Sequence, residues 1–179
     1  HDFIVTRKHV VFPVLPLTGN LERAMAGQSP FAWEPEKSGW LGVLARDAGI
    51  ETMKWIEIPA CYVFHVLNAV DTADGLVPDV RQYDAAPLFP HADGTPGDPT
   101  LTQSFMQRWT VDIDAGTMRE TQLDDRPGEF PRIDDRHAGL PHRHGWIAAI
   151  EARRPGDRGV WNEFVHLDLE EQTRTIWSD

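Results

Sequence analysis

The stretch CYVFHVLNAV, residues 61–70, places one histidine, His65, inside an otherwise apolar run. A buried imidazole needs a hydrogen-bond partner, because leaving it unsatisfied costs about 1–3 kcal/mol. Two interpretations stay open on this stretch alone. His65 is either a core histidine with a local hydrogen bond, or a neutral imidazole that binds a metal ion from within a dry shell.

Two other residues could take part in such metal chemistry. His1 precedes the apolar strand of HDFIVT, so it is either an exposed turn histidine or a ligand at a strand end. Glu129 stands between a glycine and a Phe-Pro pair in GEFPRID, so its backbone is constrained. Its carboxylate either bonds amides of its own loop or orients a ligand imidazole through the ring nitrogen that does not bind the metal.

A third pattern is His-Arg-His at 142–144, which would put His142 and His144 on one face of a strand. That spacing can hold zinc or copper, but the run is strongly polar and an ordinary surface position competes. The remaining histidines are interpreted as surface or loop residues: His9, His91, His137 and His166. No cysteine pair, glycine-rich phosphate loop or G-x-S-x-G elbow occurs, so nucleophilic catalysis and nucleotide binding have no support.

Short β-rich segments must position these side chains. Residues 108–113 alternate polar and apolar, and DIDAG and DLEEQ each reverse the chain between two such segments, as in hairpins. One helix is expected at 18–26, with Asn20 as its cap, and long loops at 84–103 and 124–142. The expected strands are 3–6, 9–14, 40–45, 53–58, 61–67, 76–81, 105–112, 117–123, 144–150, 160–167 and 173–177.

Many short antiparallel strands with almost no helix predict an all-β fold, which is a sandwich, a barrel or a propeller. Hairpins followed by a long return loop favour propeller blades of about four strands, and the expected strands make nearly three blades. Three blades do not close a propeller. The chain also begins with His1 rather than methionine, so we expect it to be part of a longer chain.

The composition limits the partners. The net charge of −11 over 179 residues argues against nucleic acid or an anionic membrane surface as the main partner. No apolar run reaches the roughly 20 residues that span a bilayer. The one cysteine, Cys61, lies in the apolar run and cannot form an internal disulfide. A buried, reduced thiol is typical of a cytoplasmic protein.

Several ordered motifs together resemble one family. They are HDFIVT, VVFPVLPL, FAWEPEKSGWLGVLAR, CYVFHVLNA, RWTVDIDAG and GEFPRID. This pattern is similar to the carotenoid cleavage oxygenases, which include apocarotenoid oxygenases, lignostilbene dioxygenases and the retinal isomerohydrolase. The resemblance covers nearly all of the chain. It implies a seven-bladed β-propeller, of which residues 1–179 would form about three blades, without the N- and C-terminal parts.

The resemblance also implies a metal site. In this family four histidines bind Fe(II) on the propeller axis, and three glutamates behind them orient the imidazoles. The H-D-F histidine corresponds to His1, the F-H-x-x-N-A histidine to His65, and the E-F-P-R glutamate to Glu129, which we expect to pair with His65. The other two ligands and two glutamates have no counterpart here. The chain also departs from the usual N-A-[FY]-E, because Val70 and Asp71 follow Ala69.

The implied activity is cleavage of a carbon–carbon double bond by O2 at Fe(II), which gives two carbonyl products. The substrate is a small apolar alkene, an apocarotenoid or a stilbene; FAWEPEK and YDAAPLFPHADG are nearer the lignostilbene branch. Peripheral membrane contact could come from regions outside this chain. The alternative is a non-catalytic propeller fragment with an incomplete metal site.

Overall fold

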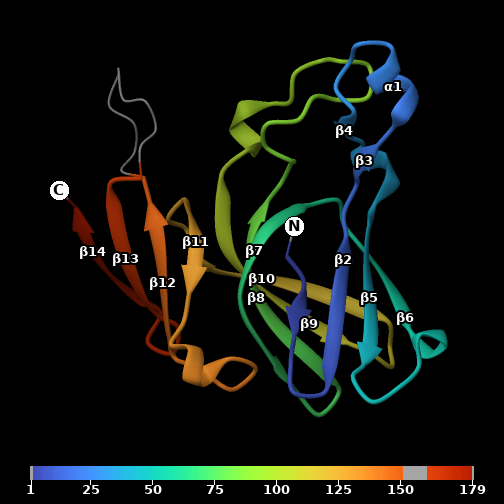
Figure 1. Cartoon of the computed structure of the whole chain (residues 1–179). Helices are drawn as coiled ribbons and strands as arrows, with labels where there is room; N and C mark the ends of the chain where they lie inside the picture. Colours follow the sequence, from blue (N-terminus) through green and yellow to red (C-terminus); the bar gives the residue numbers. More distant parts are fainter. Residues whose placement is uncertain (1, 151–160, 179) are drawn as a thin grey trace.

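The computed structural model describes residues 2–150 and 161–178, and its main feature is three four-stranded antiparallel sheets that lie side by side (Figure 1). In each sheet the strand order follows the chain outward from the first strand. The first sheet holds β1 (Ile4–Val5), β2 (His9–Val14), β5 (Gly39–Ala45) and β6 (Lys54–Ile58). The second holds β7 (Tyr62–Asp71), β8 (Gly75–Tyr83), β9 (Ser104–Asp112) and β10 (Thr117–Asp124). The third holds β11 (Gly128–Arg132), β12 (His144–Ala149), β13 (Glu163–Asp168) and β14 (Thr173–Ser178).

Smaller elements interrupt this pattern between β2 and β5 and in the loops. A two-stranded sheet pairs β3 (Leu17–Gly19) with β4 (Phe31–Trp33), and the helix α1 (Leu21–Met25) connects them. Single 3-10 turns lie at Pro35–Lys37, Ile50–Thr52, Pro99–Leu101 and Asp135–His137. No helix in the described ranges has the length and apolar character needed to cross a membrane.

The core lies between the faces of neighbouring sheets. The alternation expected at 108–113 is confirmed, because Trp109 and Val111 are buried while Thr110 is exposed. The first and second sheets share one apolar cluster, which includes Ile4 and Trp109. A second cluster joins Leu67 and Met106 of the second sheet to the third sheet. The packing therefore stacks the sheets face to face.

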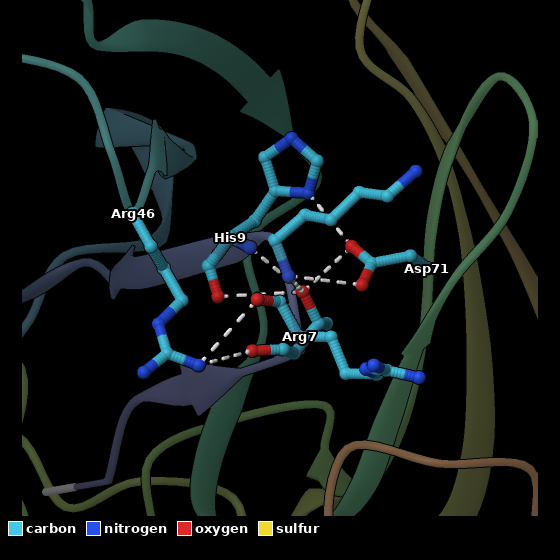
Figure 2. A network of polar contacts seen from close by, with 6 residues as sticks. Arg7, His9, Arg46 and Asp71 are labelled. Carbon is cyan, nitrogen blue, oxygen red and sulfur yellow. Dashed lines mark hydrogen bonds and ion pairs between the residues drawn. The ribbon is translucent and has the colours of Figure 1, made fainter.

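The first strands of the three sheets are neighbours, since β7 contacts both β1 and β11. Side chains at the far end of β7 tie it to the first sheet (Figure 2). The Asp71 carboxylate accepts hydrogen bonds from Thr6 Oγ1 at 2.7 Å and from the Lys8 amide at 3.0 Å, and contacts His9 Nδ1 at 2.8 Å. Arg46 adds a bond of 3.2 Å to the carbonyl of Thr6. His9 is therefore an inter-sheet contact rather than a surface residue.

Most strands lie where the sequence predicts them, but β3, β4 and β11 do not. Residues 128–132 were expected to belong to a loop, and they form β11. The pattern is hidden because Pro131 cannot donate to a ladder and the register shifts between Glu129 and Arg132. The expected helix is also shorter: Thr18 lies in β3, although Asn20 caps α1 as predicted by accepting a bond from the Arg23 amide at 3.0 Å.

The expected long loop at 84–103 is confirmed, apart from its 3-10 turn and an isolated bridge of His91 to Trp33. It packs against β4, where the Trp33 amide donates to the carbonyl of Pro90 at 2.8 Å. Cys61 is buried as expected. Burial raises the pKa of its thiol to about 12, so this thiol stays protonated and unreactive at neutral pH.

Candidate metal centre

The candidate site lies at the starts of the three inner strands, β1, β7 and β11. The amide of Val66 on β7 donates to Asp2 Oδ2 at 3.2 Å, which holds Asp2, two residues before β1, beside the residue that follows His65. Glu129 is the second residue of β11 and reaches β7 from the other side. One strand from each sheet thus brings its N-terminal end to the same place.

His65 and Glu129 are in direct contact, as the sequence predicts. Glu129 Oε2 lies 2.6 Å from His65 Nδ1, and the glutamate is only 3% exposed. When Nδ1–H donates a hydrogen bond to the carboxylate, the neutral imidazole has its lone pair on Nε2, the nitrogen that would bind a metal. The pairing and the burial together are the arrangement found around ligand histidines.

Aromatic rings surround this pair. The Phe130 ring centroid lies 5.4 Å from that of His65, and Phe64 lies 6.2 Å away on the same strand as His65. Phe64 also packs edge-on against Tyr83 at 5.6 Å. Burial raises the pKa of the Tyr83 phenol, and the negative charge of Glu129 adds to the effect. The Glu129 carboxylate is therefore buried, whereas the imidazole of His65 has aromatic neighbours but stays partly exposed.

The backbone at Glu129 has an uncommon conformation. Phe130 has a φ of 55°, in the left-handed region that non-glycine residues seldom adopt. The turn lets the Phe130 amide donate to Glu129 Oε2 at 2.8 Å, the oxygen that also contacts His65. On the other side of the glutamate, a Cβ on Gly128 would lie 2.6 Å from the carbonyl oxygen of Ala148. Only glycine fits there, so the constrained backbone expected from GEFP is present.

The metal roles of His1 and His65 stay predictions. His1 lies outside the described residues. Within residues 2–150 and 161–178, no three His, Cys, Asp or Glu side chains come together as a metal-binding group. The described part therefore offers one oriented imidazole, which fits a metal that takes its other ligands from elsewhere.

The structure does not bring His142 and His144 together. His142 is buried and its Nε2 lies 3.3 Å from Asp79, while its Nδ1 is 3.1 Å from the Asn68 amide. His144 instead contacts His166 across β12 and β13, with 3.0 Å between ring nitrogens. The structure therefore gives no support to the alternative of a zinc or copper pair at 142 and 144, because His142 precedes β12 and turns into the protein.

Sequence reasoning missed Arg81, a fully buried guanidinium close to Glu129. The signal was a charged residue in the expected strand 76–81, where Arg81 follows Val80 at a position that faces the third sheet. A charged residue inside a buried strand requires partners, and those partners can be named only from the fold.

Comparison with known proteins decides the family. The family model described as RPE65, retinal pigment epithelial membrane protein, matches residues 1–179. The chain belongs to this family. It is the family of the carotenoid cleavage oxygenases, whose solved structures are β-propellers. The three sheets are thus about three blades of a seven-bladed propeller, as the motifs predict.

Several relatives are similar over most of the chain. An isoeugenol monooxygenase of Pseudomonas putida is 36% identical over 87% of this chain and 33% of its own length. A lignostilbene-alpha,beta-dioxygenase isozyme III of Sphingomonas paucimobilis is 33% identical over 82% of this chain. The chain spans about a third of the length of these relatives.

Solved structures agree with this assignment. The lignostilbene dioxygenase of Pseudomonas brassicacearum superposes with a TM-score of 0.90 at 31% identity, over 99% of this chain and 40% of that one. A cobalt-substituted apocarotenoid oxygenase (ACO) of Synechocystis superposes with a TM-score of 0.82 at 25% identity. That Synechocystis protein therefore accepts cobalt in place of its own metal.

Proposed function

We propose that this chain supplies part of the iron site of an oxygenase that cleaves a carbon–carbon double bond with O2 to give two carbonyl products. His1 and His65 would be iron ligands, and Glu129 would orient His65. The observation that carries the proposal is the 2.6 Å contact between His65 Nδ1 and the buried Glu129 carboxylate. Family membership and the names of the relatives support the reaction class.

His1 enters the proposal through its neighbour in the sequence. Asp2 bonds the amide of Val66, which directly follows His65. Consecutive Cα atoms are about 3.8 Å apart, so a ligand before Asp2 is within reach of a metal bound at His65. Two further histidine ligands would come from outside this chain.

The residues of this chain prepare the site rather than react. Bound Fe(II) would supply O2 activation beside an electron-rich alkene. Glu129 accepts a hydrogen bond from Nδ1–H of His65, so the ring keeps one tautomer and one orientation. Its negative charge also compensates a divalent ion that has only neutral imidazole ligands. Phe64 and Phe130 pack beside the imidazole of His65 and cover part of it.

The substrate class we propose is an aryl-substituted alkene of the stilbene type. The first relatives by identity are named for isoeugenol and lignostilbene, and the solved structure with a TM-score of 0.90 is a lignostilbene dioxygenase. The carotenoid cleavage oxygenase of Mycobacterium tuberculosis has 33% identity, equal to that of the lignostilbene enzyme of Sphingomonas. An apocarotenoid is therefore the competing substrate, and the two must be compared directly.

A second function is favoured by one observation. No group of three metal-binding side chains occurs in the described ranges, so the chain by itself would bind iron weakly. As an isolated piece it would be a non-catalytic propeller fragment. The first proposal predicts that the full-length protein binds iron and consumes O2, and the second predicts that this chain alone does neither to a useful extent.

The test compares the full-length protein with its His65→Ala variant. The imidazole is lost without a new charge, so we expect bound iron and O2 uptake with lignostilbene to fall by about 100-fold or more, since ligand loss exceeds the 10–100-fold cost of losing a ligand's partner. O2 uptake with an apocarotenal decides the substrate class. The matched control is His144→Ala, an exposed histidine that contacts His166 and not Glu129. Unchanged iron content in His65→Ala would show that His65 is no ligand.

A further inference from the structure

We infer that Arg81 is a positioning residue for the metal centre, which it affects by holding the peptide that carries Glu129 against His65. This inference rests on the proposed function, since it assigns to Arg81 an effect on the metal bound at His65. Arg81 touches neither His65 nor a substrate, and its effect passes through the backbone of β11.

Arg81 lies on β8, is completely buried and directs its guanidinium toward the third sheet. Its Nε donates to the carbonyl of Gly128 at 2.9 Å. Its Nη2 donates to the carbonyl of Arg126 at 3.2 Å and to the carbonyl of Ser104. One planar guanidinium therefore binds three backbone carbonyls, and two of these, those of Arg126 and Gly128, lie where the chain enters β11.

The bond to Gly128 acts directly on Glu129. The carbonyl of Gly128 and the amide nitrogen of Glu129 belong to one planar peptide unit. Holding that oxygen therefore fixes the position and tilt of the Glu129 backbone. Ser104 Oγ donates to the same oxygen, which gives the peptide a second anchor. Shape adds a third constraint, because Gly128 lies against the backbone of β12 without room for a side chain.

The conformation that follows Glu129 explains why such anchoring is needed. Phe130 has a φ of 55°, a strained value that persists only when its surroundings hold it in place. The Phe130 amide bonds Glu129 Oε2 on one side, and Arg81 and Ser104 hold Gly128 on the other. Without the anchor before Glu129, the strand can relax to an extended form, and the carboxylate then loses its position beside Nδ1 of His65.

The charges agree with the geometry. Burial lowers the pKa of the Arg81 guanidinium to about 10, while the negative charges of Glu129 and Asp124 act to raise it. Arg81 therefore stays protonated at neutral pH, as a buried cation close to a buried carboxylate. Its Nη1 is buried without a hydrogen-bond partner in the described residues. This incomplete set of partners is costly for a residue that only fills space.

The experiment uses the full-length protein loaded with Co(II) and compares Arg81→Met and Ser104→Ala with wild type. We expect Arg81→Met to lower the Co(II) affinity about tenfold, the lower end of the effect of losing a ligand's partner. The visible absorption of bound Co(II) should change as the imidazole loses its orientation. Hydrogen exchange of the Phe130 amide should be faster, because its acceptor oxygen moves. Ser104→Ala should shift each measurement in the same direction by a smaller amount.

The control is Arg108→Met, which removes an arginine of the same sheet that pairs with Asp79 and not with Gly128. It should leave the Co(II) affinity and the Phe130 exchange rate unchanged.

If Arg81→Met folds and matches wild type in both, the inference is overturned. If Arg81→Met does not fold, Ser104→Ala decides: weaker Co(II) binding supports the inference, and unchanged binding overturns it. Failure of the proposed function is separate, since only that failure leaves Co(II) affinity unchanged in His65→Ala.

Discussion

Asp79 shows at the scale of one residue how this fold buries charge. It lies on β8 and is 1% exposed, yet both of its oxygens have charged or polar partners. Arg108 donates to them at 2.7 and 2.8 Å, and His142 lies 3.3 Å away. Burial acts to raise the pKa of Asp79, but the bonds from Arg108 and His142 outweigh it and lower the pKa. The ionised form is thus the one the fold stabilises.

This arrangement predicts a stability change with a defined pH dependence. Asp79→Asn leaves Arg108 without its counter-charge and should lower the free energy of unfolding by about 2–3 kcal/mol at pH 7, less than for a fully buried pair. Because the folded-state pKa lies below the ordinary 3.8, this stabilisation is complete above that value and is lost as the pH falls through the folded-state pKa. Urea unfolding at several pH values measures it: the difference between the two proteins should begin to shrink below about pH 4 and should vanish only below the folded-state pKa of Asp79.

The control for that prediction is Asp134→Asn. Asp134 also pairs with an arginine, Arg136, but both lie at the surface of a turn. Water screens such a pair, so its removal should change the stability little. Equal destabilisation by the two substitutions would mean that burial of Asp79 does not matter.

At the scale of one element, β7 carries both the candidate ligand and the residue that holds the loop beneath it. Asn68 Nδ2 donates to the carbonyls of His137 and Leu140 at 3.0 Å each, and its Oδ1 accepts from the Gly139 amide at 2.9 Å. One amide side chain therefore fixes the turn between β11 and β12. This gives the N-A part of the motif a physical reason that is independent of the metal.

Asn68→Ala tests this role of β7. The substitution leaves three backbone groups of the loop without their partners, so the free energy of unfolding should fall by about 1–3 kcal/mol. Hydrogen exchange of the Gly139 amide should accelerate before that of β12 does. Metal affinity should change much less than in His65→Ala. An unchanged exchange rate at Gly139 would show that the Asn68 side chain does not hold this turn in place.

The whole molecule has two outer sheet faces that expose large apolar side chains. On the first sheet these are Phe3, Val5, Phe12, Val14, Trp40 and Trp55. On the third sheet Phe164 and Trp177 are exposed and lie across from each other, with 5.8 Å between ring centroids. In a propeller such faces pack against further blades, and as free surfaces they favour association.

We therefore expect residues 1–179, expressed alone, to self-associate at micromolar concentration. Substituting one aromatic residue on each outer face, Trp55→Lys with Phe164→Lys, should shift the chain toward monomer, because a charge there opposes burial of the face. Light scattering after size-exclusion chromatography measures the mass. Leu21→Lys on α1 is the control, since that residue is 75% exposed and lies off both faces. A monomeric wild-type chain would refute this prediction.

The sequence was sufficient for the blades and for the central pair, but not for what holds the pair in place. Alternating residues such as Trp109 and Val111 identify strands because burial imposes a period of two. The contact of Glu129 with His65 followed from the family motifs rather than from spacing. The strand β11 was not predicted because Phe130 and Pro131 break that period. The role of Arg81 was not predicted because its partners are backbone carbonyls, which every residue type has.

The two ties between β1 and β7 have a consequence for the lengths of these strands. Asp2 bonds residue 66 and Thr6 bonds residue 71, so the five residues 2–6 lie alongside the six residues 66–71. The register irregularity of β7 between Val66 and Asn68 takes up the extra residue. Deleting a residue in either span would misalign the candidate ligand with the neighbouring blade. Insertions and deletions should therefore be tolerated in the loop at 84–103 but not in residues 2–6 or 66–71.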